Sequence, residues 1–252
     1  MAEAGAPDYS SLRFPDPPSD RPYVVLNMVM SADGKVVVEG TERGLGSAVD
    51  QRLMRELRAS VDIVLNGAAT LRASGTSSRI SNEALVARRV ADGRSPNPVA
   101  SVLSGTGDLP LDRLFFHGED FEAVIYLADT ASADRRAAIE QTGRTVVVVP
   151  SDDPVRTMLL HMREEIGARV LLVEGGPTIN ASLLACDAID EYFLTLGSVL
   201  VSGNVPLTPI ESDAAPSLES LTQLELISAH QDEETSELYL RYRLAGRGER
   251  QR

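Results

Sequence analysis

The stretch LLVEGGPTIN, residues 171–180, places a run of apolar residues before a carboxylate, two glycines and a proline. Its first half predicts a buried strand, because residues 170–173 are apolar without any polar alternation. Its second half predicts a helix start at Pro177. Proline has no backbone N–H, and the N–H of the first helical residue has no partner within the helix, so nothing is lost there. The strand therefore leads into a helix N-terminus at which Gly175 and Gly176 leave the backbone bare of side chains.

A helix end of this kind presents unpaired N–H groups and a partial positive charge, which favour a phosphate or pyrophosphate. An ordinary tight turn between a strand and a helix is the alternative for this stretch alone. Two other segments, VLNGAAT (64–70) and VLSGTG (102–107), leave predicted strands through glycine and small hydroxyl residues. Because parallel strands end at one edge of a sheet, the three turns together predict a nucleotide-binding crevice.

Strand and helix patterns alternate through most of the chain from Tyr23 onward. This alternation predicts an α/β protein with a mixed, mostly parallel sheet and helices on both faces. The β-like segments 189–200, 224–232 and 237–246 have no strong helix between them, so they predict antiparallel strands at the C-terminal side. In the predicted helix 47–60, Ser47 is the expected N-cap and Asp50 the reciprocal acid of a capping box.

The bulk composition excludes several classes of protein. The 252 residues are 43% hydrophobic and carry 37 acidic against 24 basic side chains, a net charge of -13. This charge is opposite to that of proteins that bind nucleic acid, so we expect no nucleic-acid partner. One cysteine and three histidines exclude a disulfide framework and predict no metal site. Without an apolar run long enough to span a bilayer, or a secretory leader, we expect a cytoplasmic protein with no membrane partner.

The chain is expected to hold one folded unit. Residues 1–20 are rich in proline, small and acidic residues and predict a flexible N-terminal arm. The regular pattern that follows contains no convincing linker or internal repeat, so residues 21–252 predict a single domain.

Three segments read in order resemble the reductase domain of riboflavin biosynthesis: NMVMSADGKV (27–36), MRELRASVDIVLNGAATL (54–71) and LLVEGGPTINASLLACDAIDEYFLTLGSVLVSG (171–203). The resemblance covers about residues 21–245 and is most specific in the last segment. The family comprises the C-terminal half of the bifunctional bacterial deaminase-reductase and free-standing reductases of archaea and fungi. Its fold is similar to that of dihydrofolate reductase, and the resemblance implies the same fold here.

The resemblance implies a homodimeric oxidoreductase that uses NADPH. Its substrate would be a phosphorylated aminopyrimidine, either 5-amino-6-(5-phosphoribosylamino)uracil or the 2,5-diamino pyrimidinone analogue, whose ribosyl group becomes a ribityl chain. Two alternatives stay open from the sequence. One is a reductase of dihydrofolate or another pterin, and the other is a nucleotide-binding module without turnover.

The resemblance also implies where the cofactor lies. It would run along the strand that carries Val29 and beside the predicted turns, contacting Gly67, Ala68, Thr70, Ser74, Ser104, Gly175, Gly176, Pro177, Thr178, Ile179 and Asn180. Ser104, with Arg88 or Arg89, is our expectation for the group that holds the 2′-phosphate. Core packing of Val29 and a helix-capping role for Thr70 are the structural alternatives.

Four charged residues are the candidates for catalysis and substrate binding. Asp33 and Glu174 are the expected catalytic carboxylates, and Arg58 and Arg79, together with Glu174, would approach the substrate. Each has a structural alternative: the pair Asp33 and Gly34 suits a tight turn, Arg58 suits a solvated helix face, and Glu174 suits a structural acceptor at a strand end.

This chain departs from the family pattern on the substrate side. Many members carry Trp-Ile-Thr or Trp-Ile-Ser where this chain has Gly44, Leu45 and Gly46. Many also carry an Asp-Asp-Pro segment followed by a phosphate-binding arginine motif, where this chain has residues 74–79. Arg79 could replace the arginine of that motif. The chain also lacks the His-x-Glu and Pro-Cys-x-x-Cys motifs of the zinc deaminase, so we expect no deaminase domain in it.

Overall fold

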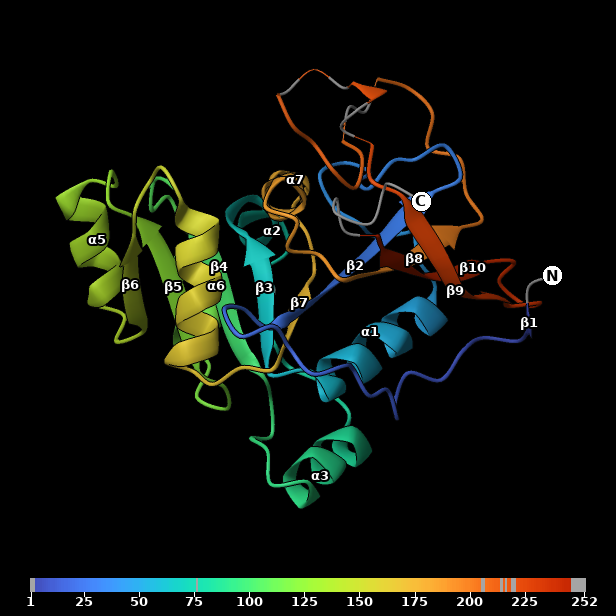
Figure 1. Ribbon diagram of the computed structural model, residues 1–252, viewed down its shortest axis with the longest axis horizontal. Coiled ribbons are helices and arrows are strands. Elements are labelled where there is room, and N and C mark those ends of the chain that lie inside the picture. Colours follow the sequence, from blue (N-terminus) through green and yellow to red (C-terminus); the bar gives the residue numbers. More distant parts are fainter. Residues whose placement is uncertain are drawn as a thin grey trace.

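One ten-stranded sheet runs through the protein, as the computed structural model shows (Figure 1). The structure describes residues 3–75, 77–204, 207–213, 215, 217–218 and 221–245, so the last part of the predicted domain, residues 246–252, lies outside it. The strands are β1 (Glu3–Ala4), β2 (Tyr23–Ser31), β3 (Ile63–Gly67), β4 (Val99–Ser104), β5 (Ala123–Ala128), β6 (Thr145–Val149), β7 (Val170–Val173), β8 (Glu191–Gly197), β9 (Leu224–Gln231) and β10 (Leu238–Leu244).

Seven helices accompany the sheet in this part of the chain. They are α1 (Ala48–Ser60), α2 (Ala68–Ser74), α3 (Glu83–Ala91), α4 (Leu114–His117), α5 (Ala133–Glu140), α6 (Pro154–Glu164) and α7 (Pro177–Ala185). Among the described residues, none of these helices has the length and apolar character needed to cross a membrane.

The strand order is β1-β9-β10-β8-β2-β7-β3-β4-β5-β6. The strands from β8 through β2 to β6 pair in parallel, whereas β10 runs antiparallel to both β8 and β9. The prediction of a mostly parallel sheet with antiparallel strands at its C-terminal side is therefore confirmed. The polar turn between β9 and β10 accounts for the change of direction, because Asp232 accepts the backbone N–H groups of Glu234 and Thr235 and closes a hairpin.

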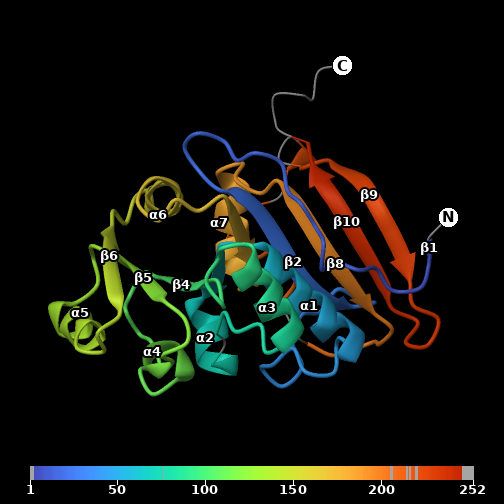
Figure 2. The same ribbon diagram turned by 90° about the horizontal axis from the view of Figure 1, so that it is seen from below.

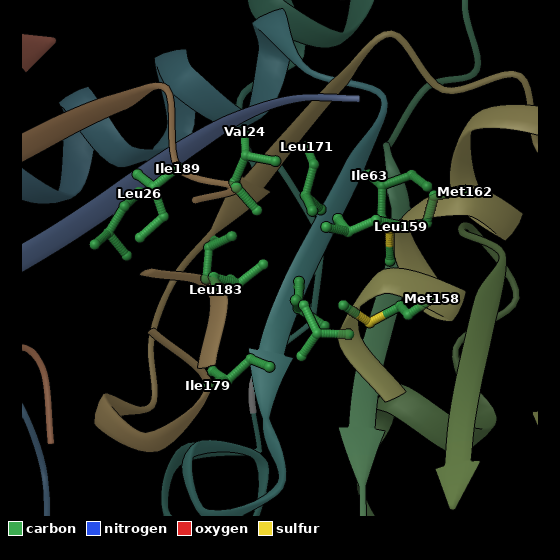
Figure 3. Close-up of a cluster of buried hydrophobic side chains, with 14 of the residues drawn as sticks. Val24, Leu26, Ile63, Met158, Leu159, Met162, Leu171, Ile179, Leu183 and Ile189 are labelled. Carbon is green, nitrogen blue, oxygen red and sulfur yellow. The ribbon is translucent and has the colours of Figure 1, made fainter. Parts of the chain in front are cut away.

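Helices cover both faces of the sheet (Figure 2). On one face, α6 and α7 direct apolar side chains such as Leu159 and Leu183 onto β2, β3 and β7 (Figure 3). On the other face, α1 packs Leu53 and Leu57 against β2 and β8. The central strand β7 is buried on both sides, which explains why its sequence is apolar at every position.

The N-terminal segment differs from the expected flexible arm, because it packs along the domain. Tyr9 is buried, its ring meets that of Phe193 edge to face at 5.0 Å, and its backbone N–H donates to Glu56 at 2.8 Å. Strand β1 adds in parallel to the edge strand β9. Aromatic side chains within the proline-rich segment therefore bury enough surface to hold it against α1 and β8.

Candidate active site

A pocket of about 780 Å³ opens where β2, β3 and β7 end and where α1 passes over the sheet. Most of its lining comes from α1, the two strand-to-helix turns and the loop before α1: Asn27, Met28, Val29, Val36, Val37, Gly40, Glu42, Arg43, Gly44, Gly46, Asp50, Gln51, Met54, Arg58, Asn66, Ala69, Thr70, Ala73, Ser74, Gly75, Ser77, Glu174, Gly175, Gly176, Pro177 and Leu207. This volume suits a small-molecule or cofactor site.

The turns after β3 and β7 lie directly against each other. The Gly67 N–H donates to the Gly175 carbonyl at 2.7 Å, and a β-carbon built on Gly67 would lie 3.2 Å from the Gly176 nitrogen. A β-carbon on Gly176 would lie 3.3 Å from Oγ1 of Thr70. Gly175 has a φ of +84°, a conformation that side-chain-bearing residues rarely adopt. Backbone geometry thus favours glycine at residue 175, and the close approach of Thr70 favours it at residue 176.

Helix α7 begins at Pro177, with Gly176 as an N-cap that has no side chain to satisfy the helix end. The next three predicted cofactor contacts do not line the pocket. Thr178 is exposed, Ile179 is buried in the core, and the buried Asn180 amide donates to the Pro209 carbonyl at 2.8 Å. Residues 175–177 therefore form the wall of the pocket, and the rest of the helix start supports it.

Arg58 and Glu174 form a buried ion pair in the pocket wall. The guanidinium donates from Nε and Nη2 to the two carboxylate oxygens, both at 2.6 Å, and from Nη1 to the Arg79 carbonyl at 2.7 Å. Their side chains are only 10% and 8% exposed. Burial alone would lower the pKa of the Arg58 guanidinium, but the Glu174 carboxylate raises it above its usual value. Arg58 is therefore a paired, buried charge and not the solvated helix charge of the alternative reading.

Asp33 lies outside the pocket lining and anchors a loop. Its carboxylate accepts the Ser31 hydroxyl at 2.7 Å and the backbone N–H groups of Val201 and Ser202 at 3.0 and 2.9 Å. These hydrogen bonds lower the pKa of the Asp33 carboxyl to about 2. The arrangement matches the structural alternative, in which Asp33 shapes the turn that follows β2.

The remaining predicted residues divide between the pocket and its surroundings. Val29, Thr70 and Ser74 line the pocket, whereas Gly67 and Ala68 lie in the turn and helix start behind it. The Arg79 guanidinium lies outside the pocket lining. At the surface it forms an ion pair with Asp120, in which Nη2 lies 2.7 Å from Oδ1.

The structure does not bring the expected 2′-phosphate group together, and Arg88 donates to the Ser10 hydroxyl at 3.4 Å. Ser104 is buried, and its hydroxyl accepts the Gly107 N–H at 3.0 Å within its own loop. Arg89 is also buried, and it donates to the Ala59 and Val61 carbonyls at the end of α1. That expectation was wrong for Arg89, because its guanidinium satisfies the carbonyls that α1 leaves unpaired.

The prediction that Asp50 completes a capping box was also wrong. The Ser47 N–H donates at 2.7 Å to Glu237, which lies directly before β10, and the Ser47 hydroxyl donates to the same carboxylate at 2.7 Å. Asp50 instead lines the pocket. Burial raises the pKa of its carboxyl to about 6, a neighbouring Thr195 hydroxyl opposes the rise, and the Glu237 charge adds to it. The sequence indicated an acid in the first helical turn but not this role.

Comparison with known proteins places this chain in a family. Residues 22–235 match the family described as the RibD C-terminal domain. The chain belongs to this family. Among curated proteins, it is 30% identical to a 2,5-diamino-6-ribosylamino-4(3H)-pyrimidinone 5′-phosphate reductase of Archaeoglobus fulgidus over 73% of this chain and 83% of the relative. It is 29% identical to a reductase of the same name from Aquifex aeolicus over 83% of this chain and 91% of that protein.

Solved structures show the same fold at lower sequence identity. A pyrimidine reductase-like protein from Corynebacterium diphtheriae superposes with a TM-score of 0.80 at 18% identity, over 90% of this chain and 93% of that chain. Acinetobacter baumannii RibD gives a TM-score of 0.73 at 19% identity, over 90% of this chain and 59% of that chain.

Proposed function

We propose that this protein is an NADPH-dependent reductase of riboflavin biosynthesis that converts the ribosyl group of a phosphorylated aminopyrimidine to a ribityl chain. The observation that carries the proposal is the family match together with curated relatives that are named as pyrimidinone phosphate reductases. The pocket at the carboxyl ends of β2, β3 and β7 is the site at which we place the reaction.

The residues of the pocket fit a nicotinamide dinucleotide. Gly175 and Gly176 expose backbone in the pocket wall, and Pro177 begins a helix whose first N–H groups have no side-chain cap. Such a wall suits a pyrophosphate, while Val29 offers an apolar surface to the nicotinamide. When bound, NADPH would supply the hydride that reduces the sugar C1 of an open-chain imine, and one proton would complete the reduction. The protein would hold the cofactor and the substrate in the orientation needed for hydride transfer and exclude water from the pocket.

We assign different charged side chains to the phosphate and to the sugar of the substrate. Two arginines line the pocket, and Arg58 is committed to Glu174. Arg43 has no ion pair in the described part of the chain, so we assign it the substrate phosphate. Glu174 would lie beside the sugar, where its negative charge favours the cationic form of the imine. Because Arg58 holds both of its oxygens, we propose that Glu174 stabilises charge and does not donate the proton.

Two further properties belong to the proposal. We propose that the protein acts in the cytoplasm, where the phosphorylated intermediates and NADPH of this reaction class are found. We also propose that it forms a homodimer through the outer strand β9, on which Leu224 and Leu226 are 46% and 54% exposed.

The test is an assay of NADPH oxidation with each candidate substrate in turn: the diaminopyrimidinone ribosyl phosphate, the aminouracil ribosyl phosphate and dihydrofolate. The proposal predicts oxidation with one of the ribosyl phosphates and none with dihydrofolate. A thermal melt checks cofactor binding separately, since a ligand at about 100 times its dissociation constant adds roughly 2.7 kcal/mol of stability. Turnover of dihydrofolate alone, or a melt unchanged by NADPH, would reject the proposal.

A further inference from the structure

The Asp50 carboxylate fits into the pocket wall because residue 46 is a glycine. A β-carbon built on Gly46 would lie 2.5 Å from Oδ2 of Asp50, so any side chain at residue 46 would displace the carboxylate. Thr195 on β8 is the hydrogen-bonding neighbour of Asp50, and Thr195 pairs in register with Val29 on β2. The carboxylate therefore lies over the strand that we assign to the nicotinamide, on the side of the sheet that α1 covers.

Among the described residues, the Thr195 hydroxyl is the one side-chain hydrogen-bond partner of this carboxylate. Glu237 already satisfies Ser47 at the start of α1, and Glu237 also accepts the Tyr239 hydroxyl. Asp50 forms no ion pair with any described residue, and it faces the negative charge of Glu237 and the hydroxyl of Tyr9. Burial of the Asp50 carboxylate, and to a lesser extent the nearby Glu237 charge, costs stability and raises the pKa of Asp50 to about 6. Such a costly group at the wall of a pocket indicates a ligand-binding role.

An ionised carboxylate presents two hydrogen-bond acceptors side by side and no donor. A 2-amino-4-pyrimidinone offers the matching pair, because the ring N3–H and the 2-amino group both donate along one edge. That edge is the one opposite the ribosylamino group, so binding by it leaves the sugar free to reach the nicotinamide. A uracil ring has a carbonyl in place of the 2-amino group, so one carboxylate oxygen would face another acceptor.

We propose that Asp50 binds the N3–H and 2-amino groups of a 2-amino-4-pyrimidinone ring and thereby selects the diaminopyrimidinone ribosyl phosphate over the aminouracil. The inference rests on the proposed function and specifies its substrate. Asp50 is thus a specificity-determining residue, distinct from the Arg58–Glu174 pair.

The decisive variant is Asp50→Asn, which keeps the shape of the side chain. An amide presents one acceptor and one donor, the pattern that matches N3–H and the 2-carbonyl of uracil. We expect the wild type to prefer the diaminopyrimidinone by about 10- to 100-fold in kcat/KM, the discrimination of one paired hydrogen-bond contact. In Asp50→Asn this preference should fall to about equal or reverse. Glu83→Gln, which removes an exposed first-turn acid from α3, should keep the wild-type ratio.

Binding of the bare rings separates this inference from the proposed function. Calorimetry with 2,5,6-triamino-4-pyrimidinone and with 5,6-diaminouracil, at saturating NADPH, should give the same preference and the same change in Asp50→Asn. If neither ribosyl phosphate is reduced, the proposed function fails, and the ring affinities still decide the role of Asp50. A wild type that does not favour the aminopyrimidinone ring, or an Asp50→Asn variant that keeps the wild-type ratio, overturns the inference.

Discussion

Arg58 and Glu174 each compensate the buried charge of the other, and this dependence can be measured. Removing one partner of a buried pair leaves an uncompensated charge, so Arg58→Met should lower the free energy of unfolding by about 3–5 kcal/mol. The double variant Arg58→Met with Glu174→Gln should lose much less than the sum of its two single changes. Urea unfolding of the four proteins measures this coupling. Strictly additive losses would show that the two side chains do not depend on each other.

Asp50 predicts a pH dependence of stability whose sign follows from its pKa. Its pKa is raised in the folded protein, from about 3.8 to about 6, so the folded state binds the proton more tightly than the unfolded state. The stability that this group contributes is present below pH 4 and is lost as the pH rises through 6. Asp50→Asn, which resembles the protonated form, should match the wild type near pH 4.

Near pH 7, Asp50→Asn should be more stable than the wild type by about 1–2 kcal/mol, because the variant buries no charge at this position. The difference is no larger because water in the pocket already lowers the cost of burying the wild-type carboxylate. Denaturant unfolding at the two pH values measures the difference. A variant that is less stable than the wild type at pH 7 would mean that the hydrogen bond from Thr195 outweighs the cost of burying the Asp50 charge.

At the scale of elements, the turn between β7 and α7 carries the cofactor proposal. Gly176 has an ordinary φ of -53°, so only space limits a side chain there. Gly176→Val should abolish NADPH binding, because the branched side chain would occupy the pocket wall. Some stability should also be lost, since Thr70 lies 3.3 Å from the position of a β-carbon. Calorimetric titration of the folded variant is the measurement, and wild-type affinity in a less stable protein would reject the phosphate role of this turn.

The order of the elements could be predicted from sequence because the buried strands are short apolar runs. Strand β7 and the start of α7 at Pro177 were confirmed. The packing of residues 3–20 could not be predicted, because it depends on Tyr9 meeting Phe193 on a distant strand. Local composition predicts whether a segment forms regular structure by itself, but it does not predict which distant residues the segment packs against.

The site was only partly predictable for the same reason. Short-range patterns indicated the glycine turn and Glu174, since strand, turn and helix follow one another in the chain. The role of Asp50 was missed because Glu237, 190 residues after Ser47, takes the capping position. Asp33 was expected at the reaction centre, but its hydrogen bonds to the backbone of Val201 and Ser202 place it in a loop.

At the scale of the whole molecule, the outer strand β9 predicts self-association. Leu224 and Leu226 are apolar and exposed on a strand whose edge β1 covers only at its end. If they form the dimer interface, Leu226→Glu should raise the dimer dissociation constant by more than tenfold, while its melt stays cooperative. Sedimentation equilibrium measures the association. A wild type that is monomeric at micromolar concentration would contradict the homodimer.

In the proposed reaction, this pocket transfers a hydride from NADPH to the sugar carbon of a phosphorylated aminopyrimidine. The most direct measurement uses NADPH that carries deuterium in the transferred position, with mass spectrometry and NMR of the product. We expect a ribityl product with one deuterium at C1 for each NADP⁺ formed. A ribityl product without deuterium, or NADPH oxidation that yields no reduced pyrimidine, would contradict it.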